Sequence, residues 1–244
     1  MSVNITQGMM LILAAALPAG GAQAATLIHD YEFDGASVVD SVGSVDGTLV
    51  NGASLSGGKL ILDGSNDYVQ LAGKIIPTAG ADFSVYLKFD ATDPQNYGIA
   101  EMISQGASGA PGFYLGYYAP GVRVTDNHSD GNGISFPFGA HDMLLTSGGG
   151  GTYLYIDGVQ KLFYASALTL GSGGDDTRFG TQFASYAEYF TGSIDTVRVF
   201  SGVASYAEAT TAPGVPEPAS WAMMVAGIGL AGAALRRRGV ARAA

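Results

Sequence analysis

The chain has 244 residues, a formal net charge of −10 and no cysteine, which excludes disulfides, thiolate zinc sites and cysteine nucleophiles. Glycine at 37 positions and a charged fraction of only 13% favour short strands joined by tight turns over helices. An acidic surface repels phosphate backbones, so we exclude nucleic acid as a partner, whereas Ca²⁺ suits carboxylate oxygens.

Residues 1–24 have the order of parts found in a secretory signal peptide. An apolar stretch from Met9 to Leu17 predicts a short signal helix, although no Lys or Arg precedes it. Ala22 and Ala24 satisfy the small-x-small rule of signal peptidase, which predicts cleavage between Ala24 and Ala25. The sequence therefore predicts an exported protein, with signal peptidase as one processing partner.

Residues 25–211 are predicted to form one all-β domain. Strict alternation in Phe83–Asp90 places its apolar side chains on one buried face. Asp157-Gly158 predicts a two-residue hairpin with a type I′ turn. Further strands are expected at Lys59–Asp63, Tyr68–Leu71, Gly112–Tyr118, Gly121–Thr125, Asp142–Thr146, Phe179–Thr181 and Ser193–Phe200. Many short strands without an amphipathic helix predict a two-sheet sandwich.

Five motifs then occur in the order seen in a known group of domains. They are the opening Tyr31–Gly35 with Asp40–Gly43, Leu62–Val69, Phe83–Phe89, Leu154–Val159 and the closing Gly192–Phe200. Together they resemble laminin-G-like domains of the concanavalin A-like lectin and glucanase superfamily. The resemblance implies a jelly-roll sandwich of roughly a dozen strands. Members bind sugars, bind proteins or act as glycosidases, so the fold alone does not settle function.

A calcium site is one expectation for the acidic residues. Alternation places Asp195 on the same predicted apolar side as Val197, where a carboxylate needs a partner. In laminin-G-like relatives a calcium ion often lies between the opening loop and the closing strand. The resemblance therefore implies a structural Ca²⁺ held by Asp34, Asp40, Asp46 and Asp195. The alternative is that loop amides donate hydrogen bonds to Asp195.

Aromatic residues supply the candidates for ligand binding. Alternation places Tyr114 and Tyr118 on one face of a strand, and an open face would offer flat platforms on which sugar rings stack. Tyr153 and Tyr155 are two further candidates. The alternative is that these tyrosines pack between sheet and loop.

The sequence lacks the paired carboxylates of a glycosidase. A retaining glycosidase needs two carboxyl groups about 5 Å apart. Concanavalin A-like glucanases carry them on a Glu-x-Asp-x-x-Glu or Glu-x-Asp-x-Glu strand, and this chain has neither pattern. Its glutamates are isolated along the sequence, at Glu32, Glu101, Glu188, Glu208 and Glu217. We therefore predict no catalysis, and polysaccharide binding is favoured over a non-binding structural role and over a glycoside hydrolase.

The C-terminus has three parts in a fixed order. A linker at 212–218 carries Val215, Pro216, Glu217 and Pro218, an apolar run covers 219–235, and a basic tail covers 236–244. About 17 helical residues span roughly 25 Å, slightly less than the bilayer's hydrocarbon core of ~30 Å. The sequence therefore predicts a transmembrane helix, and Arg236, Arg237 and Arg238 fix its end on the cytoplasmic side.

The ordered combination resembles the PEP-CTERM sorting domain. That resemblance implies processing by exosortase in a Gram-negative bacterium that makes extracellular polysaccharide. The expected location is first the inner membrane, as an anchored intermediate, and then the cell surface or the extracellular matrix.

Overall fold

The computed structural model describes residues 25–92, 98–107, 111–125, 133–183 and 187–211. The signal helix, the cleavage residues Ala22 and Ala24, the sorting motif, the transmembrane helix and the three arginines of the tail lie outside these residues. No helix within the described ranges is long and apolar enough to cross a membrane.

The described residues form fourteen strands and one short helix. Their bounds are β1 Thr26–Tyr31, β2 Gly47–Val50, β3 Ser54–Ser56, β4 Lys59–Asp63, β5 Tyr68–Leu71, β6 Phe83–Ala91, β7 Ile99–Gly106, β8 Phe113–Tyr118, β9 Gly121–Val124, β10 Gly139–Gly148, β11 Gly151–Ile156, β12 Val159–Tyr164, β13 Asp175–Phe179, β14 Thr191–Ser201 and α1 Tyr206–Thr210.

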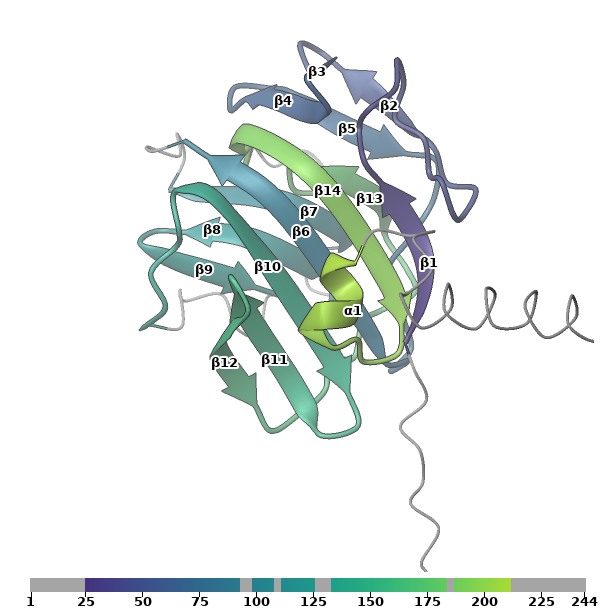
Figure 1. The fold of residues 1–244 in the computed structure, drawn as a ribbon, viewed down its shortest axis with the longest axis vertical. Coiled ribbons are helices and arrows are strands. Elements are labelled where there is room, and N and C mark those ends of the chain that lie inside the picture. Colours follow the sequence, from purple (N-terminus) through teal and green to yellow (C-terminus); the bar gives the residue numbers. More distant parts are fainter. Residues whose placement is uncertain (1–24, 93–97, 108–110, 126–132, 184–186, 212–244) are drawn as a thin grey trace, which may run out of the picture.

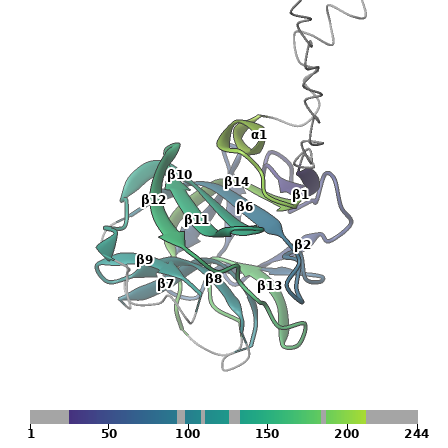
Figure 2. The same cartoon turned by 90° about the horizontal axis from the view of Figure 1, so that it is seen from below.

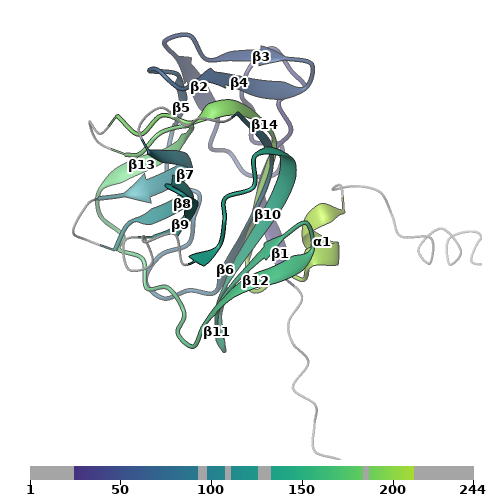
Figure 3. The same cartoon turned by 90° about the vertical axis from the view of Figure 1, so that its left-hand side faces the viewer.

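Two antiparallel sheets make up the sandwich (Figures 1 and 3). The eight-stranded sheet has the order β12-β11-β10-β6-β14-β4-β3, and β1 also pairs with β14. The six-stranded sheet has the order β2-β5-β13-β7-β8-β9. Strands distant in sequence are neighbours, as jelly-roll topology requires, and the prediction of an all-β two-sheet sandwich is confirmed.

The core lies between the sheets and follows from strand alternation. Phe83, Val85, Leu87 and Phe89 of β6 are at most 1% exposed and belong to one cluster that spans both layers. Burying one such side chain stabilises the fold by roughly 1.5–3 kcal/mol. The hairpin is also as predicted, because Asp157 and Gly158 both have positive φ, at 50° and 75°. The type I′ turn needs both angles.

The short helix α1 was not predicted, and it covers the outer face of the eight-stranded sheet (Figures 2 and 3). Ser205 and Glu208 form a capping box at its start. Its Ala209 is fully buried in a second, smaller apolar cluster, whose other buried members are Tyr86, Leu144, Phe200 and Ala204. Five residues are too few for periodicity to reveal a helix, so only the capping pair marked it in the sequence.

Asp195 corrects one prediction. A register shift between Ile194 and Thr196 in the pairing of β14 with β6 interrupts the alternation at Asp195. Its side chain is 20% exposed rather than buried beside Val197, and its oxygens lie 3.2 Å from Lys59 Nζ and 3.7 Å from Lys88 Nζ. The ammonium groups of Lys59 and Lys88 therefore supply the counter-charge that a partly buried carboxylate requires.

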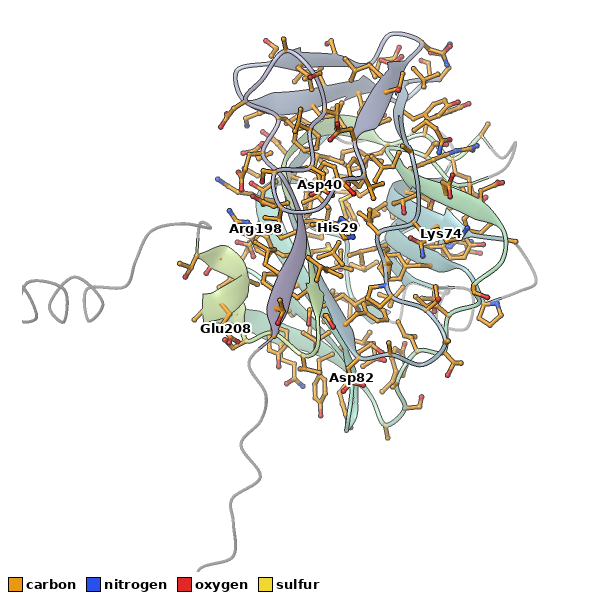
Figure 4. All side chains as sticks on the ribbon, turned by 90° about the vertical axis from the view of Figure 1, so that its right-hand side faces the viewer. His29, Asp40, Lys74, Asp82, Arg198 and Glu208 are labelled. Atoms are coloured by element: carbon orange, nitrogen blue, oxygen red, sulfur yellow. The ribbon has the colours of Figure 1, made fainter. Side chains whose placement is uncertain are left out.

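The opening loop is held together by one carboxylate (Figure 4). Asp40 Oδ2 lies 2.6 Å from His29 Nδ1, and the Asp40 oxygens accept backbone N–H groups of Asp30, Gly43 and Val45 at 2.9–3.2 Å. Burial by itself would raise the pKa of Asp40, but the bond to His29 and these backbone bonds lower it below its usual value. Asp40 therefore ties β1 to the loop that follows it.

We predict that Asp40→Asn lowers the free energy of unfolding at pH 7 by about 2–3 kcal/mol, because an amide presents a donor where N–H donors converge. A lowered folded-state pKa stabilises the fold above the unfolded carboxylate's pKa of about 3.9, and this stabilisation disappears as pH falls through the folded value. Urea denaturation at pH 7 and at pH 3 measures both effects.

The exposed Asp34 of the same segment is the matched control, and Asp34→Asn should change stability by less than about 0.5 kcal/mol. Equal losses in the two variants, or a loss at Asp40 that persists unchanged in acid, would contradict the assignment.

Candidate functional site

The outer face of the six-stranded sheet carries the candidate site. In β8, Phe113, Leu115 and Tyr117 pack in the core, so Tyr114 and Tyr118 share the opposite face, as predicted. The expectation that Tyr114 offers an open platform is wrong, because its side chain is fully buried. Phe183 stacks on its ring with centroids 5.0 Å apart, and this contact occupies the surface that a sugar would need.

A row of residues crosses this face next to Tyr114. Glu101 of β7 is paired with Gly116 of β8, and Gly116 is paired with Arg123 of β9. Glu188 joins the row because its carbonyl accepts the Glu101 N–H at 3.1 Å. The missing side chain at Gly116 lets charged groups from both sides meet across β8.

Arg123 connects the row. Its Nη1 donates to Glu101 Oε1 and, at 2.9 Å, to Glu188 Oε2, while its Cζ lies 4.3 Å from the centre of the Tyr114 ring. The side chains of Arg123, Glu101 and Glu188 are 9%, 0% and 16% exposed. We call Glu101, Arg123, Glu188, Tyr114 and Phe183 the Arg123 cluster. Of its charged groups, the Glu188 carboxylate is the most accessible.

The charges of the Arg123 cluster compensate one another. Burial by itself would lower the pKa of Arg123, but the charges of Glu101 and Glu188 raise it above its usual value. A guanidinium shared by two carboxylates favours the ionised form of both. Each charge of the Arg123 cluster therefore has an opposite charge beside it.

A second arginine is held in the same way farther along the face. Arg178 of β13 donates from Nε to Gln70 Oε1 at 2.7 Å, and its Cζ lies 5.3 Å from the centre of the Tyr68 ring. Thr48 of β2 is paired with Gln70 and is exposed. The outer face thus presents planar amide and guanidinium groups beside aromatic rings, each fixed by a neighbour.

The other predicted tyrosines lie in different places. Tyr118 is half-buried on the same face as the Arg123 cluster. Tyr153 is half-buried in the eight-stranded sheet, where its ring lies 4.8 Å from that of Phe163. Tyr155 packs against the smaller cluster under α1. The four tyrosines therefore do not form one site.

The four aspartates proposed for calcium are also not gathered. Asp40 and Asp46 adjoin, since the Asp40 N–H donates to Asp46 Oδ1 at 2.9 Å, but Asp195 lies against the two lysines. Within the described ranges no three His, Cys, Asp or Glu residues form a metal-ligand group. Both Asp40 oxygens already accept hydrogen bonds, so an ion there would have to displace them.

Calcium binding stays a prediction, and calorimetric titration of the domain with Ca²⁺ tests it. Binding heat together with a higher melting temperature would support the site. No heat and no shift on adding chelator would reject it.

A cleft lies elsewhere, between the segment 133–137 and the β11–β12 hairpin. Its lining is Gly133, Ile134, Ser135, Pro137, Ile156, Asp157, Val159 and Lys161. No aromatic ring is among these residues, so the cleft offers nothing on which a sugar ring could stack. We therefore favour the outer face of the six-stranded sheet.

Sequence reasoning missed the Arg123 cluster because its charged members are 22 and 65 residues apart along the chain. One signal was present. Arg123 stands between Val122 and Val124, both fully buried, in a strand whose four residues are all buried. A lone arginine in such a strand requires an acidic partner from another strand.

We predict that Gly116→Ala disrupts the row. A Cβ there would lie 2.1 Å from the Ala100 carbonyl oxygen and 2.9 Å from Glu101 Oε2, which forces strands β7 and β8 apart. The free energy of unfolding should fall by about 2–3 kcal/mol in urea denaturation.

Gly149→Ala is the matched control for this substitution, because nothing lies within 4 Å of its Cβ position. A Gly116 variant as stable as the Gly149 variant would show that the close approach across β8 is not required.

Comparison with known protein families agrees with the observed fold. The profile of the concanavalin A-like lectin/glucanases superfamily matches residues 63–210, and the profile of the PEP-CTERM protein-sorting motif matches residues 214–238. No curated protein sequence matches the chain. The sorting motif implies export and membrane-anchored sorting by exosortase.

Solved structures share the fold at low identity. Domain 4 of the extracellular arabinanase AbnA from Geobacillus stearothermophilus, solved with arabinotriose, has a TM-score of 0.62 at 16% identity, over 77% of this chain and 98% of that one. A Trypanosoma rangeli sialidase mutant has 0.57 at 14%, over 76% of this chain and 32% of that one. The botulinum neurotoxin serotype D binding domain has 0.56 at 16%, over 75% and 50%.

The chain thus spans about a third of the longer sialidase, half of the toxin domain and nearly all of the arabinanase domain. At these identities the likeness concerns the fold. Taken with the sandwich topology and the match over residues 63–210, it shows that the chain belongs to the concanavalin A-like lectin/glucanase superfamily and carries a PEP-CTERM sorting motif.

Proposed function

We propose that the domain is a non-catalytic polysaccharide-binding module of an exosortase-sorted surface or matrix protein, and that it binds sugar on the outer face of the six-stranded sheet. The observation that carries this proposal is the presence there of two groups of planar polar side chains, each fixed by its neighbours. Arg123 and Glu188 at one end, and Arg178 and Gln70 at the other, are joined in pairs at 2.9 and 2.7 Å beside aromatic rings.

Such groups suit sugar hydroxyls for a physical reason. A carboxylate, an amide and a guanidinium each offer two hydrogen-bonding atoms in one plane, and adjacent sugar hydroxyls can bond to both. Because the side chains are already ordered by each other, little conformational entropy is lost when a ligand binds. Tyr118 lies on the same face and supplies an apolar surface for a ring.

Two kinds of neighbour support this choice. The arabinanase domain was solved with an arabinotriose, and the toxin domain is described as a binding domain. Neither description extends to this chain, whose ligand must be found by experiment.

The proposal is tested on a glycan array with the fragment Ala25–Thr211. We predict that Tyr118→Ala and Glu188→Gln each weaken binding about tenfold, equivalent to roughly 1.4 kcal/mol. Tyr153→Ala, which removes an aromatic ring from the outer face of the other sheet, is the matched control and should bind normally.

The other outcomes separate the alternatives. An array on which the unchanged fragment binds nothing would favour a structural role in the matrix. Loss of binding only in Tyr153→Ala would move the site to the eight-stranded sheet. Release of reducing sugar from β-glucans or from the host's own exopolysaccharide would make the domain an enzyme.

A further inference from the structure

The last described residue, Thr211, lies on the side of the domain opposite the candidate sugar site. Thr211 follows α1, which lies on the outer face of the eight-stranded sheet, while the Arg123 cluster is on the outer face of the other layer (Figures 2 and 3).

Helix α1, which ends just before Thr211, is firmly attached to the eight-stranded sheet. Tyr206 Oη donates to Asp142 of β10 at 2.8 Å, and Arg198 Nη1 of β14 donates to the Ala209 carbonyl at 2.9 Å. The side chain of Ala209 is fully buried against the sheet. The chain is therefore fixed to the sandwich as far as Thr211.

The connection to the apolar run is short. Only the seven residues 212–218 separate Thr211 from the run that starts at Ala219, and at about 3.5 Å per residue they span at most about 28 Å. A globular domain of this size has a radius of gyration of about 16 Å and a diameter of about 40 Å. The linker cannot reach from α1 around to the opposite face.

We propose that the linker and α1 together fix the orientation of the anchored domain, so that the outer face of the eight-stranded sheet is turned toward the lipid surface. The outer face of the six-stranded sheet is then turned away from the bilayer. This proposal rests on insertion of residues 219–235 into the membrane, and it does not require that the domain binds sugar.

The absence of native cysteine makes the orientation measurable with single-cysteine variants. Lys88 reports on the α1 side, because it is exposed and paired across the sheet with Asp142. Thr48 reports on the opposite side, since it is exposed and paired with Gln70 of the outer face. If the lipid headgroups of the vesicles carry a quencher, a small fluorophore on each cysteine is quenched only when that cysteine lies near the membrane.

The experiment uses the exported chain, without its signal peptide, in phosphatidylcholine vesicles that contain a spin-labelled headgroup lipid. We expect quenching at least about threefold stronger for Lys88→Cys than for Thr48→Cys, because the tether is shorter than the domain diameter. Equal quenching at the two positions, or stronger quenching at Thr48→Cys, would overturn the proposal.

Two further variants test the cause. Ala209→Asp places a charge in the buried contact of α1, which frees residues 205–211 and lengthens the tether by about 25 Å. Ala207→Asp introduces the same charge on the exposed side of α1. The difference in quenching between the two probe positions should shrink in Ala209→Asp and persist in Ala207→Asp. An unchanged difference in Ala209→Asp would contradict the role of α1.

A third variant leaves the domain untouched. A flexible Gly-Ser insertion of about twenty residues after Thr211 exceeds the domain diameter when extended, so the two probes should be quenched equally. A persistent difference would mean that something other than the tether sets the orientation, which overturns the proposal. Flotation of every variant with the vesicles separately verifies that the tail is inserted.

Discussion

Close packing of one apolar face from each sheet is the constraint on which the rest of the structure depends. Alternation in β6, and in β14 on either side of Asp195, directs side chains into the space between the layers, and Phe83, Leu87 and Val199 are fully buried there. The remaining side chains of each strand must then lie outside. The side chains on the two outer faces therefore determine what the domain can contact.

The two outer faces are used differently. On the eight-stranded sheet the apolar residues Tyr86, Leu144 and Phe200 are covered by α1, and Arg198 anchors the helix from below. On the six-stranded sheet the outward groups are polar or aromatic, and they are ordered by contacts with one another. One face therefore holds the chain end, and the other presents groups suited to a ligand.

Two glutamates on the outer face of the six-stranded sheet share one arginine. Glu101 and Glu188 do approach one another, but both contact the guanidinium of Arg123, which keeps their charges compensated. Removal of any one of these three charged side chains would lower the stability of the fold, because an unpaired buried charge is strongly destabilising. The Arg123 cluster is thus at once part of the scaffold and part of the candidate binding face.

Local patterns in the sequence determined the architecture and the sorting motif. Alternation in Phe83–Asp90, the turn at Asp157-Gly158 and the ordered PEP-CTERM tail each depend on residues in one continuous segment, so they can be interpreted without a structure. Only the tertiary structure decided that Tyr114 is buried, that a register shift places Asp195 beside two lysines, and that Glu101, Arg123 and Glu188 meet. Those outcomes depend on which strands become neighbours and in what register, and pairing between strands far apart along the chain leaves no periodic trace in the sequence.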